Sequence, residues 1–180
     1  MIEFRHFVDA YCTHQPVLYE VLKNSEGKIL ELGCGMGSTQ ITNHFSTNRQ
    51  VLTVENNKEW YEQYKQQFEN KNHLFLLIKD WPQTLKNLLN EYDVIFVDQD
   101  TWESRLEAVK LFKNHANYII VHDYDSLPVF LNYNWQDDYR YYQEFSPFPR
   151  PYPTGPPTVI LSNRNKLMFK IDFHSYTVIQ

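Results

Sequence analysis

The chain has 180 residues, of which 42% are hydrophobic, and it carries 22 acidic side chains against 17 lysines and arginines. This length and composition predict one globular domain over residues 1–180, with a buried core and little room for a second domain. The formal net charge of −5 disfavours nucleic acid as a partner, because phosphate contacts need a basic surface. Two cysteines make no disulfide framework, no apolar run is long enough to span a membrane, and no signal peptide is recognisable. We therefore expect a soluble cytoplasmic protein with no membrane partner.

Short apolar segments alternate with helical stretches through the first two thirds of the chain. This alternation predicts an α/β fold with a mostly parallel sheet and helices on both faces. The expected strands are residues 28–32, 50–54, 74–78, 93–97 and 117–121. The expected helices are residues 37–46, 57–69, 82–91 and 102–114. Residues 1–24 are expected to add a helical cover at the N-terminus.

The pattern changes after residue 121. A segment rich in Tyr and Asp covers 122–144, and a stretch with six prolines covers 145–157. Two apolar segments follow, Thr158–Leu161 and Leu167–Phe173, joined by Ser-Asn-Arg-Asn. This turn-rich connection predicts that the two segments form a C-terminal antiparallel hairpin.

The first expected strand is followed directly by a glycine-rich turn. Its apolar residues stop at three glycines spaced two apart, and a helix begins at Ser38: the glycines are Gly33, Gly35 and Gly37. Such a turn brings bare backbone against a small ligand, since glycine allows positive φ and has no Cβ. The acidic Glu31 and the GxGxG spacing, rather than GxGxxG, favour S-adenosylmethionine over a pyrophosphate. A tight turn without a ligand is the alternative.

This stretch resembles the first motif of the class I, Rossmann-like methyltransferases, written E/D-x-G-x-G-x-G. The resemblance implies S-adenosylmethionine as cofactor and a seven-stranded sheet whose last strand is antiparallel. The five strand–helix units closed by a hairpin match that sheet. The cofactor-binding residues expected in this motif are Glu31, Gly33, Gly35, Gly37 and Ser38.

A second acidic position ends the next strand. Glu55 lies 22 residues after Gly33, the distance at which a strand-end carboxylate binds the ribose hydroxyls of a nucleoside. A solvated glutamate is the alternative for Glu55 taken alone. Asn56 joins it as a cofactor-binding candidate, and Asn56 and Asn57 are expected to cap the following helix.

The pair Asp80-Trp81 follows the third strand. In the class I family, an acidic side chain here often accepts a hydrogen bond from the adenine amino group, and a neighbouring apolar side chain packs on the ring. Asp80 and Trp81 are therefore cofactor-binding candidates. Asp80 also suits the N-cap of a helix that has Pro82 in its first turn, and the two roles are compatible.

Polar side chains follow the fourth and fifth strands. Asp98 comes directly after Val94–Val97, and His122-Asp123 comes directly after the apolar segment 119–121. Because parallel strands end at one edge of a sheet, we expect these side chains to face one another at the ligand site. Asp98 is thus a candidate for both cofactor binding and catalysis. His122 titrates in the range of a general base.

These two motifs look like those of the macrocin-type sugar O-methyltransferases and, more distantly, the catechol-type enzymes. Those relatives bind Mg²⁺ through acidic groups at these strand ends, so the resemblance implies a metal at Asp98 and Asp123, with Asp100 or Asp125 as helpers. The acid–amide pair of the catechol-type site is replaced here by His122 and Asp123. A metal-free mechanism with His122 as base therefore stays open beside a Mg²⁺-dependent one. His14 could also reach over the cofactor, although a lone histidine is more often structural.

The proline-rich segment 145–157 carries Phe148, Arg150 and Tyr152 and is expected to wall the acceptor site. Recognition of a partner protein is the alternative for such a segment. The function that follows is S-adenosylmethionine-dependent methylation of an oxygen on a sugar or another small molecule. Two alternative functions remain: a nicotinamide-dependent oxidoreductase and a non-catalytic binding module on the same scaffold. The oxidoreductase is disfavoured because Ser38 occupies the position of the third glycine in its GxGxxG motif.

Overall fold

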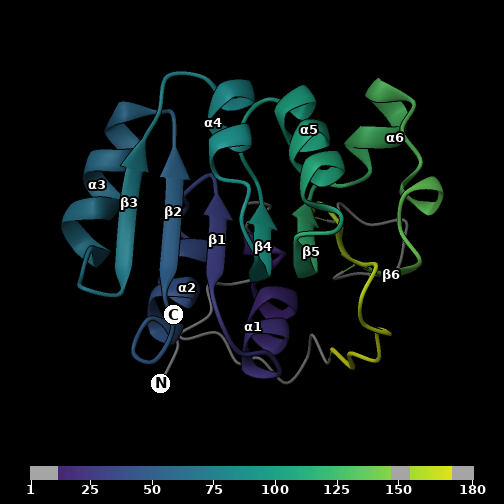
Figure 1. Ribbon diagram of the computed structural model, residues 1–180, viewed down its shortest axis with the longest axis horizontal. Helices are drawn as coiled ribbons and strands as arrows, with labels where there is room; N and C mark the ends of the chain where they lie inside the picture. The colour runs from purple at the N-terminus through teal and green to yellow at the C-terminus, as the bar shows by residue number, and fades with distance from the viewer. Residues whose placement is uncertain (1–11, 147–154, 172–180) are drawn as a thin grey trace.

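The structure, a computed structural model, describes residues 12–146 and 155–171. Seven strands form one sheet in the order β3-β2-β1-β4-β5-β7-β6 (Figure 1). The strands are β1 (Ile29–Leu32), β2 (Val51–Glu55), β3 (His73–Leu77), β4 (Tyr92–Val97), β5 (Ala116–His122), β6 (Tyr141–Phe145) and β7 (Thr158–Ser162). The helices are α1 (Gln15–Lys23), α2 (Ser38–Phe45), α3 (Lys58–Phe68), α4 (Trp81–Asn87), α5 (Trp102–Phe112), α6 (Ser126–Leu131) and the short 3-10 helix η2 (Trp135–Asp137).

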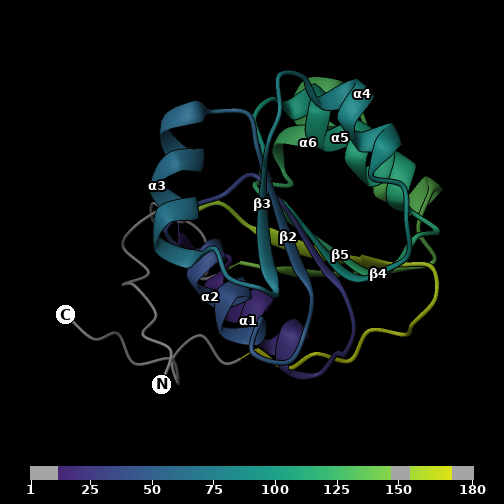
Figure 2. The same cartoon turned by 60° about the vertical axis from the view of Figure 1, so that its left-hand side comes forward.

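The first five strands are parallel, and β7 runs antiparallel to both of its neighbours. Helices α1, α2 and α3 cover one face of the sheet, and α4, α5 and α6 cover the other (Figure 2). The predicted fold class is therefore confirmed. None of the described helices has the length and apolar character needed to cross a membrane.

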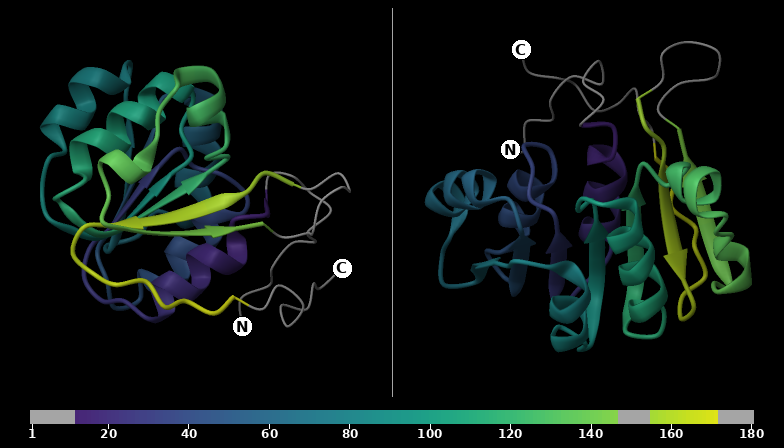
Figure 3. Two further views of the ribbon diagram at one scale, coloured as in Figure 1. Left: turned by 90° about the vertical axis from the view of Figure 1, so that its right-hand side faces the viewer. Right: turned by 90° about the horizontal axis from the view of Figure 1, so that it is seen from above.

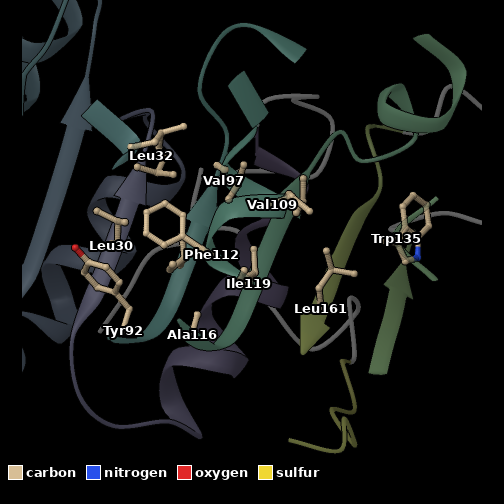
Figure 4. Close-up of a cluster of buried hydrophobic side chains, with 14 of the residues drawn as sticks. Leu30, Leu32, Tyr92, Val97, Val109, Phe112, Ala116, Ile119, Trp135 and Leu161 are labelled. Carbon is tan, nitrogen blue, oxygen red and sulfur yellow. The ribbon is translucent and has the colours of Figure 1, made fainter. Parts of the chain in front are cut away.

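Consecutive residues of the central strands enter two different hydrophobic cores. Leu30 and Leu32 of β1 pack with Phe112 of α5 in the larger core, on the α4–α6 side of the sheet (Figure 4). Ile29 points to the opposite face and packs with Val17 of α1. Side chains alternate along a strand, so a continuous apolar run serves both cores. The two layers fix the strand ends, where the polar residues of the site begin.

Two helices start at side chains that the sequence marks as caps. Asn57 Oδ1 accepts hydrogen bonds from Glu59 N and Trp60 N, at 3.0 and 3.2 Å, and so begins α3 directly after β2. Asp80 Oδ1 accepts from Gln83 N at 3.2 Å and begins α4. These oxygens satisfy amides that a helix leaves unpaired at its N-terminus. The cap roles predicted for Asn57 and Asp80 are confirmed.

The C-terminal hairpin differs from the prediction in one of its strands. β7 covers the expected segment, but it lies beside β6 (Tyr141–Phe145) (Figure 3). Phe145 is paired to Thr158. The predicted partner, Leu167–Phe173, forms no strand over its described residues 167–171. The end of the Tyr- and Asp-rich segment thus forms an edge strand. The sequence does not predict this strand, because it lacks an alternation of apolar and polar residues there.

The apolar residues after β7 pack on a face of the sheet instead of extending it. Leu167, Phe169 and Ile171 contact the core on the α1–α2 side. The side chain of Gln143 in β6 holds this segment, because its amide donates to Phe169 O at 2.7 Å and accepts from Phe169 N at 3.2 Å. The alternation in 167–171 therefore reflects packing on a core rather than strand pairing.

Candidate functional site

The carboxyl ends of β1, β4 and β5 meet at one edge of the sheet. The strand register places Gly33, Asp98 and His122 beside one another across these three strands. Asp98 N donates to Leu32 O at 2.9 Å, which continues the β1–β4 ladder to this edge. The expectation that Asp98 and His122 converge is confirmed.

Gly33 is the glycine of this turn that no other residue can replace without strain. Its φ is +86°, and a Cβ there would lie 2.7 Å from Gln99 N and 2.8 Å from Asp98 C. A side chain would therefore both strain this turn and collide with the backbone after β4. The absence of a Cβ lets β1 turn sharply against β4.

The other two glycines meet different surroundings. A Cβ on Gly37, the residue before α2, would lie 3.0 Å from Nε2 of His14 and from the side-chain nitrogen of Gln15. A Cβ on Gly35 would meet nothing closer than 3.8 Å, at Ser38 Oγ and the Trp60 ring. The space at Gly35 thus faces the buried Ser38, which begins α2, and Trp60 of α3.

Glu31 lies beneath the glycine turn and is fully buried. Its carboxylate accepts from Thr53 Oγ1 at 2.6 Å and from Thr39 Oγ1 at 3.0 Å, and Thr39 Oγ1 in turn accepts from Gly35 N at 2.9 Å. Burial raises the pKa of Glu31 to about 7, although the hydroxyl hydrogen bonds work to lower it. Glu31 therefore holds the turn from below through Thr39, and its oxygens are engaged by hydroxyls within the protein.

Glu55 ends β2 with its carboxylate facing the same turn. Oε2 accepts from Cys34 N at 2.9 Å, and Oε1 accepts from Asn56 N at 2.8 Å and Asn57 N at 2.7 Å. Three backbone amides thus fix this side chain beside the glycine turn. A carboxylate has about four lone-pair positions, so it retains capacity for a ligand hydroxyl. Asn56 takes part through its backbone amide.

The Asp80-Trp81 pair does not form the expected binding surface for adenine. Asp80 is exposed, but Trp81 is only 4% exposed and packs in the larger core, so its ring has no free face for a nucleobase. Trp60 is 46% exposed and is the tryptophan whose ring approaches Gly35. Among the described aromatic residues, Trp60 is thus better placed than Trp81 to contact a planar ligand at the glycine turn.

Asp98 and His122 form a hydrogen-bonded pair that continues to the N-terminal segment. His122 Nδ1 lies 3.2 Å from Asp98 Oδ1, and Nε2 lies 3.0 Å from Thr13 Oγ1. The Thr13 hydroxyl donates its one proton to Pro156 O at 2.7 Å, so His122 Nε2 must be the donor to Thr13. With Asp98 ionised, Nδ1 is a donor as well, and His122 is an imidazolium.

The pKa directions agree with this assignment. Burial works to lower the pKa of His122, but Asp98 and then Asp123 outweigh it and raise the pKa. Burial works to raise the pKa of Asp98, but the charge and hydrogen bond of His122 and the charge of Arg105 lower it overall. A general base needs a free lone pair, and His122 has none in this arrangement. This argues against the predicted role of His122 as the base.

Arg105 of α5 joins the ends of β4 and β5. Its guanidinium donates to Gln99 O at 2.6 Å, His122 O at 2.9 Å and Asp98 O at 3.0 Å. It also lies 3.0 Å from Asp98 Oδ1 and 3.5 Å from Asp123 Oδ2. Trp102 packs against the cation, with the ring centroid 4.5 Å from Cζ. Arg105 thus holds both strand-end loops with one buried cation.

The Mg²⁺ site that the resemblance implies does not fit this arrangement. The guanidinium of Arg105 contacts both Asp98 and Asp123, so the pair of carboxylates already shares a cation. Asp125 precedes α6 and Asp100 is exposed, and neither completes a group of metal-type donors in residues 12–146 and 155–171. An all-carboxylate magnesium site on Asp98 and Asp123 is therefore not supported.

Four residues of this site are not among those that the sequence predicts to bind the cofactor or a metal or to act in catalysis. Thr13 and His14 come from the segment before α1, Arg105 comes from the buried side of α5, and Trp60 comes from α3. For Arg105, a charged residue between apolar helix positions is the signal available in the sequence. Most of the proline-rich segment, with Phe148, Arg150 and Tyr152, lies outside the described residues; its end contributes Pro156 O to the Thr13 contact.

Comparisons with known proteins identify the fold. An rRNA methylase from Streptococcus thermophilus is 14% identical, with a TM-score of 0.57 over 83% of this chain and 95% of that one. A precorrin-6y C5,15-methyltransferase from Geobacter metallireducens is 14% identical, with a TM-score of 0.53 over 83% and 87%. No protein-family model and no curated protein sequence matches the chain. The chain thus has the Rossmann-like methyltransferase fold.

The same fold also occurs in a protein named for a different activity. Spermidine synthase from Thermotoga maritima is 16% identical, with a TM-score of 0.58 over 87% of this chain and 58% of that one. A likeness at these identities establishes the architecture alone, and the reaction has to be argued from the residues at the carboxyl edge of the sheet.

Proposed function

We propose that this protein binds S-adenosylmethionine on the glycine turn and transfers its methyl group to an oxygen of a small molecule, such as a sugar. The observation that carries the proposal is the pairing of the glycine turn with Glu55. The turn that begins at Gly33 leaves open space at Gly35, and the Glu55 carboxylate is fixed beside the turn by three backbone amides. Bare backbone next to a strand-end carboxylate suits the ribose of a nucleoside cofactor.

The space at Gly35 supports a nucleoside rather than a diphosphate. Trp60, Ser38 and the turn surround this position, and the exposed Trp60 ring offers an apolar face for a planar base. The backbone amides of Cys34 and Gly35 donate to the side chains of Glu55 and Thr39, so neither amide is free to bind a diphosphate. This disfavours the nicotinamide-dependent alternative, because the backbone amides of such a glycine turn bind the cofactor's diphosphate.

Asp98 is the polar group best placed to meet an acceptor. It lies next to Gly33 across the β1–β4 ladder, and its side chain is 23% exposed, whereas His122 behind it is buried. Methyl transfer requires alignment of the acceptor oxygen with the sulfonium, and a carboxylate that accepts a hydroxyl hydrogen bond supplies this alignment. His122 and Arg105 hold Asp98 in place.

The net charge of −5 supports a small-molecule acceptor over a nucleic acid, even though one protein of the same fold is named an rRNA methylase. The carboxyl groups of Asp98 and Glu55 at the edge of the sheet are also unfavourable neighbours for phosphate backbones. A hydroxyl-bearing sugar or ring compound has no such conflict.

The test is a thermal-shift comparison followed by a transfer assay. S-adenosylhomocysteine is expected to raise the melting temperature, and NADH at the same concentration is not. Radiolabelled S-adenosylmethionine is then offered with a panel of sugars and phenols and, separately, with RNA. Label on a hydroxyl compound supports the proposal. Protection by NADH alone, or label on RNA alone, would overturn it, and binding without any transfer would favour a non-catalytic module.

A further inference from the structure

His14 is a buried histidine that lacks hydrogen-bond partners among the described residues. It is 1% exposed, and neither Nδ1 nor Nε2 has a partner there. Its ring lies against Phe96 and His122, with centroids 4.8 and 4.5 Å away. A buried polar group without a partner is unfavourable, so an unpaired imidazole inside a protein indicates a missing ligand.

The polar neighbours of His14 form a compact donor group. One donor atom from each of His14, Asp98 and His122 lies within 4.8 Å of the other two. His122 Nδ1 and Asp98 Oδ1 are 3.2 Å apart, the separation of two ligands on one ion with bonds of about 2.0–2.2 Å. The donor atom of His14 lies within 4.8 Å of both. We propose that His14, Asp98 and His122 bind one divalent transition-metal ion.

The surroundings of His122 are those of a metal-bound histidine. Binding of the ion at Nδ1 releases the proton that Nδ1 otherwise donates to Asp98. Nε2 still donates to Thr13 Oγ1 at 3.0 Å, and Thr13 still donates to Pro156 O at 2.7 Å. Metal-bound histidines regularly donate their second nitrogen to such a partner, which fixes the tautomer and the ring. The described end of the proline-rich segment thus supports the donor group through Thr13.

Asp98 is supported in the same way. Arg105 donates to Asp98 Oδ1 and to the backbone on both sides of the donor group. It keeps the carboxylate at the end of β4, because its Nη2 lies 3.0 Å from Asp98 Oδ1 and its Nη1 lies 3.5 Å from Asp123 Oδ2. The two strand ends and the segment before α1 are therefore fixed relative to one another.

The donor set selects the kind of ion. Two imidazoles and one carboxylate suit Zn²⁺, Fe²⁺ or Co²⁺, whereas Mg²⁺ prefers oxygen ligands. Three protein ligands leave coordination positions open. Binding of the ion does not depend on the proposed methyl transfer; only the use of an open position for the acceptor oxygen rests on it.

Metal uptake by the full chain tests this inference without cofactor. Chelator-stripped protein is dialysed against Co²⁺ or Zn²⁺, and bound metal is counted by mass spectrometry, with Co²⁺ absorption reporting nitrogen ligation. We expect one ion per chain and no displacement by equimolar Mg²⁺. His14→Ala and Asp98→Asn should weaken binding by well over tenfold, and Thr13→Val by about 10–100-fold, as for other outer partners. His44→Ala, on the exposed surface of α2, is the matched control.

The results separate this inference from the proposed function. No stoichiometric uptake by the unsubstituted chain, or equal uptake by His14→Ala, Asp98→Asn and His44→Ala, would overturn the metal site. His14→Gln and circular dichroism show whether a loss of uptake reflects unfolding, and loss in a folded His14→Gln supports the site. Metal binding without S-adenosylhomocysteine binding leaves the site standing and removes the proposed function, and the reverse result does the opposite.

Discussion

The carboxyl edge of the sheet has two halves of different construction. On the β1–β2 side, Glu31 and Glu55 are bonded to threonine hydroxyls and backbone amides close to the glycine turn. On the β4–β5 side, Asp98, His122 and Arg105 form a charged group that also depends on Thr13. The first half is a hydrogen-bonded cradle built from residues 31–57, and the second is a charged group that joins the ends of β4 and β5 to the segment before α1. The proposed cofactor site and the proposed acceptor site thus lie side by side but are held by different contacts.

The largest effect should come from removing the cation of the charged half. Arg105→Met leaves the half-buried Asp98 and Asp123 without their shared partner and frees three carbonyl groups, so we expect a loss of about 3–5 kcal/mol in the free energy of unfolding. Urea denaturation measures this loss. Arg140→Met, at an exposed position beside Tyr141, is the control and should change stability by less than about 0.5 kcal/mol. Equal effects at the two positions would show that Arg105 does not hold the strand ends together.

The glycine turn allows a matched pair within the other half. Gly33→Ala should destabilise the protein by about 2–5 kcal/mol, since positive φ and a collision with the backbone of Gln99 both oppose the new Cβ. Gly35→Ala meets nothing closer than 3.8 Å and should leave stability nearly unchanged while reducing affinity for S-adenosylhomocysteine. Thermal denaturation and calorimetry separate the two effects. A tolerated Gly33→Ala would mean that the turn is looser than described.

Glu31 provides a pH test of the cradle. Its pKa is raised from an ordinary value of 4.5 to about 7, so folding favours the protonated form, and its contribution to stability declines as pH rises from about 5 to 8. At about 1.4 kcal/mol per pKa unit, the decline is about 2–3 kcal/mol. Glu31→Gln should remove this part of the pH profile, whereas the exposed Glu59→Gln should retain it. Parallel profiles for Glu31→Gln and the unsubstituted chain would contradict the raised pKa.

The two halves also differ in how far the sequence predicts them. The five parallel strands and the helices between them lie within a few residues of their predicted bounds, because period-2 and period-3.6 apolar patterns are local signals. Glu55, Asp98 and His122 were identified because polar residues that follow buried strands collect at one edge.

The remaining features depend on contacts between distant segments. β6 pairs with the free edge of β7, but the sequence Tyr-Tyr-Gln-Glu-Phe does not indicate which strand it will pair with. Arg105 reaches both strand ends only once α5 packs on the sheet, and the unpaired state of His14 becomes apparent only in three dimensions. The position of Trp81 after β3 predicts an exposed aromatic ring, but helix α4 orients this side chain toward the larger core.

The most direct test of the central claim is the affinity of Glu55→Gln for S-adenosylhomocysteine, measured by calorimetry. If the cradle binds the ribose, this change should weaken binding by about 1–3 kcal/mol, the range for hydrogen bonds to a charged group. Glu59→Gln, four residues along the chain and exposed on α3, should bind as the unsubstituted chain does. Unchanged affinity in a folded Glu55→Gln, or no binding by the unsubstituted chain, would contradict the account of a nucleoside site at the glycine turn.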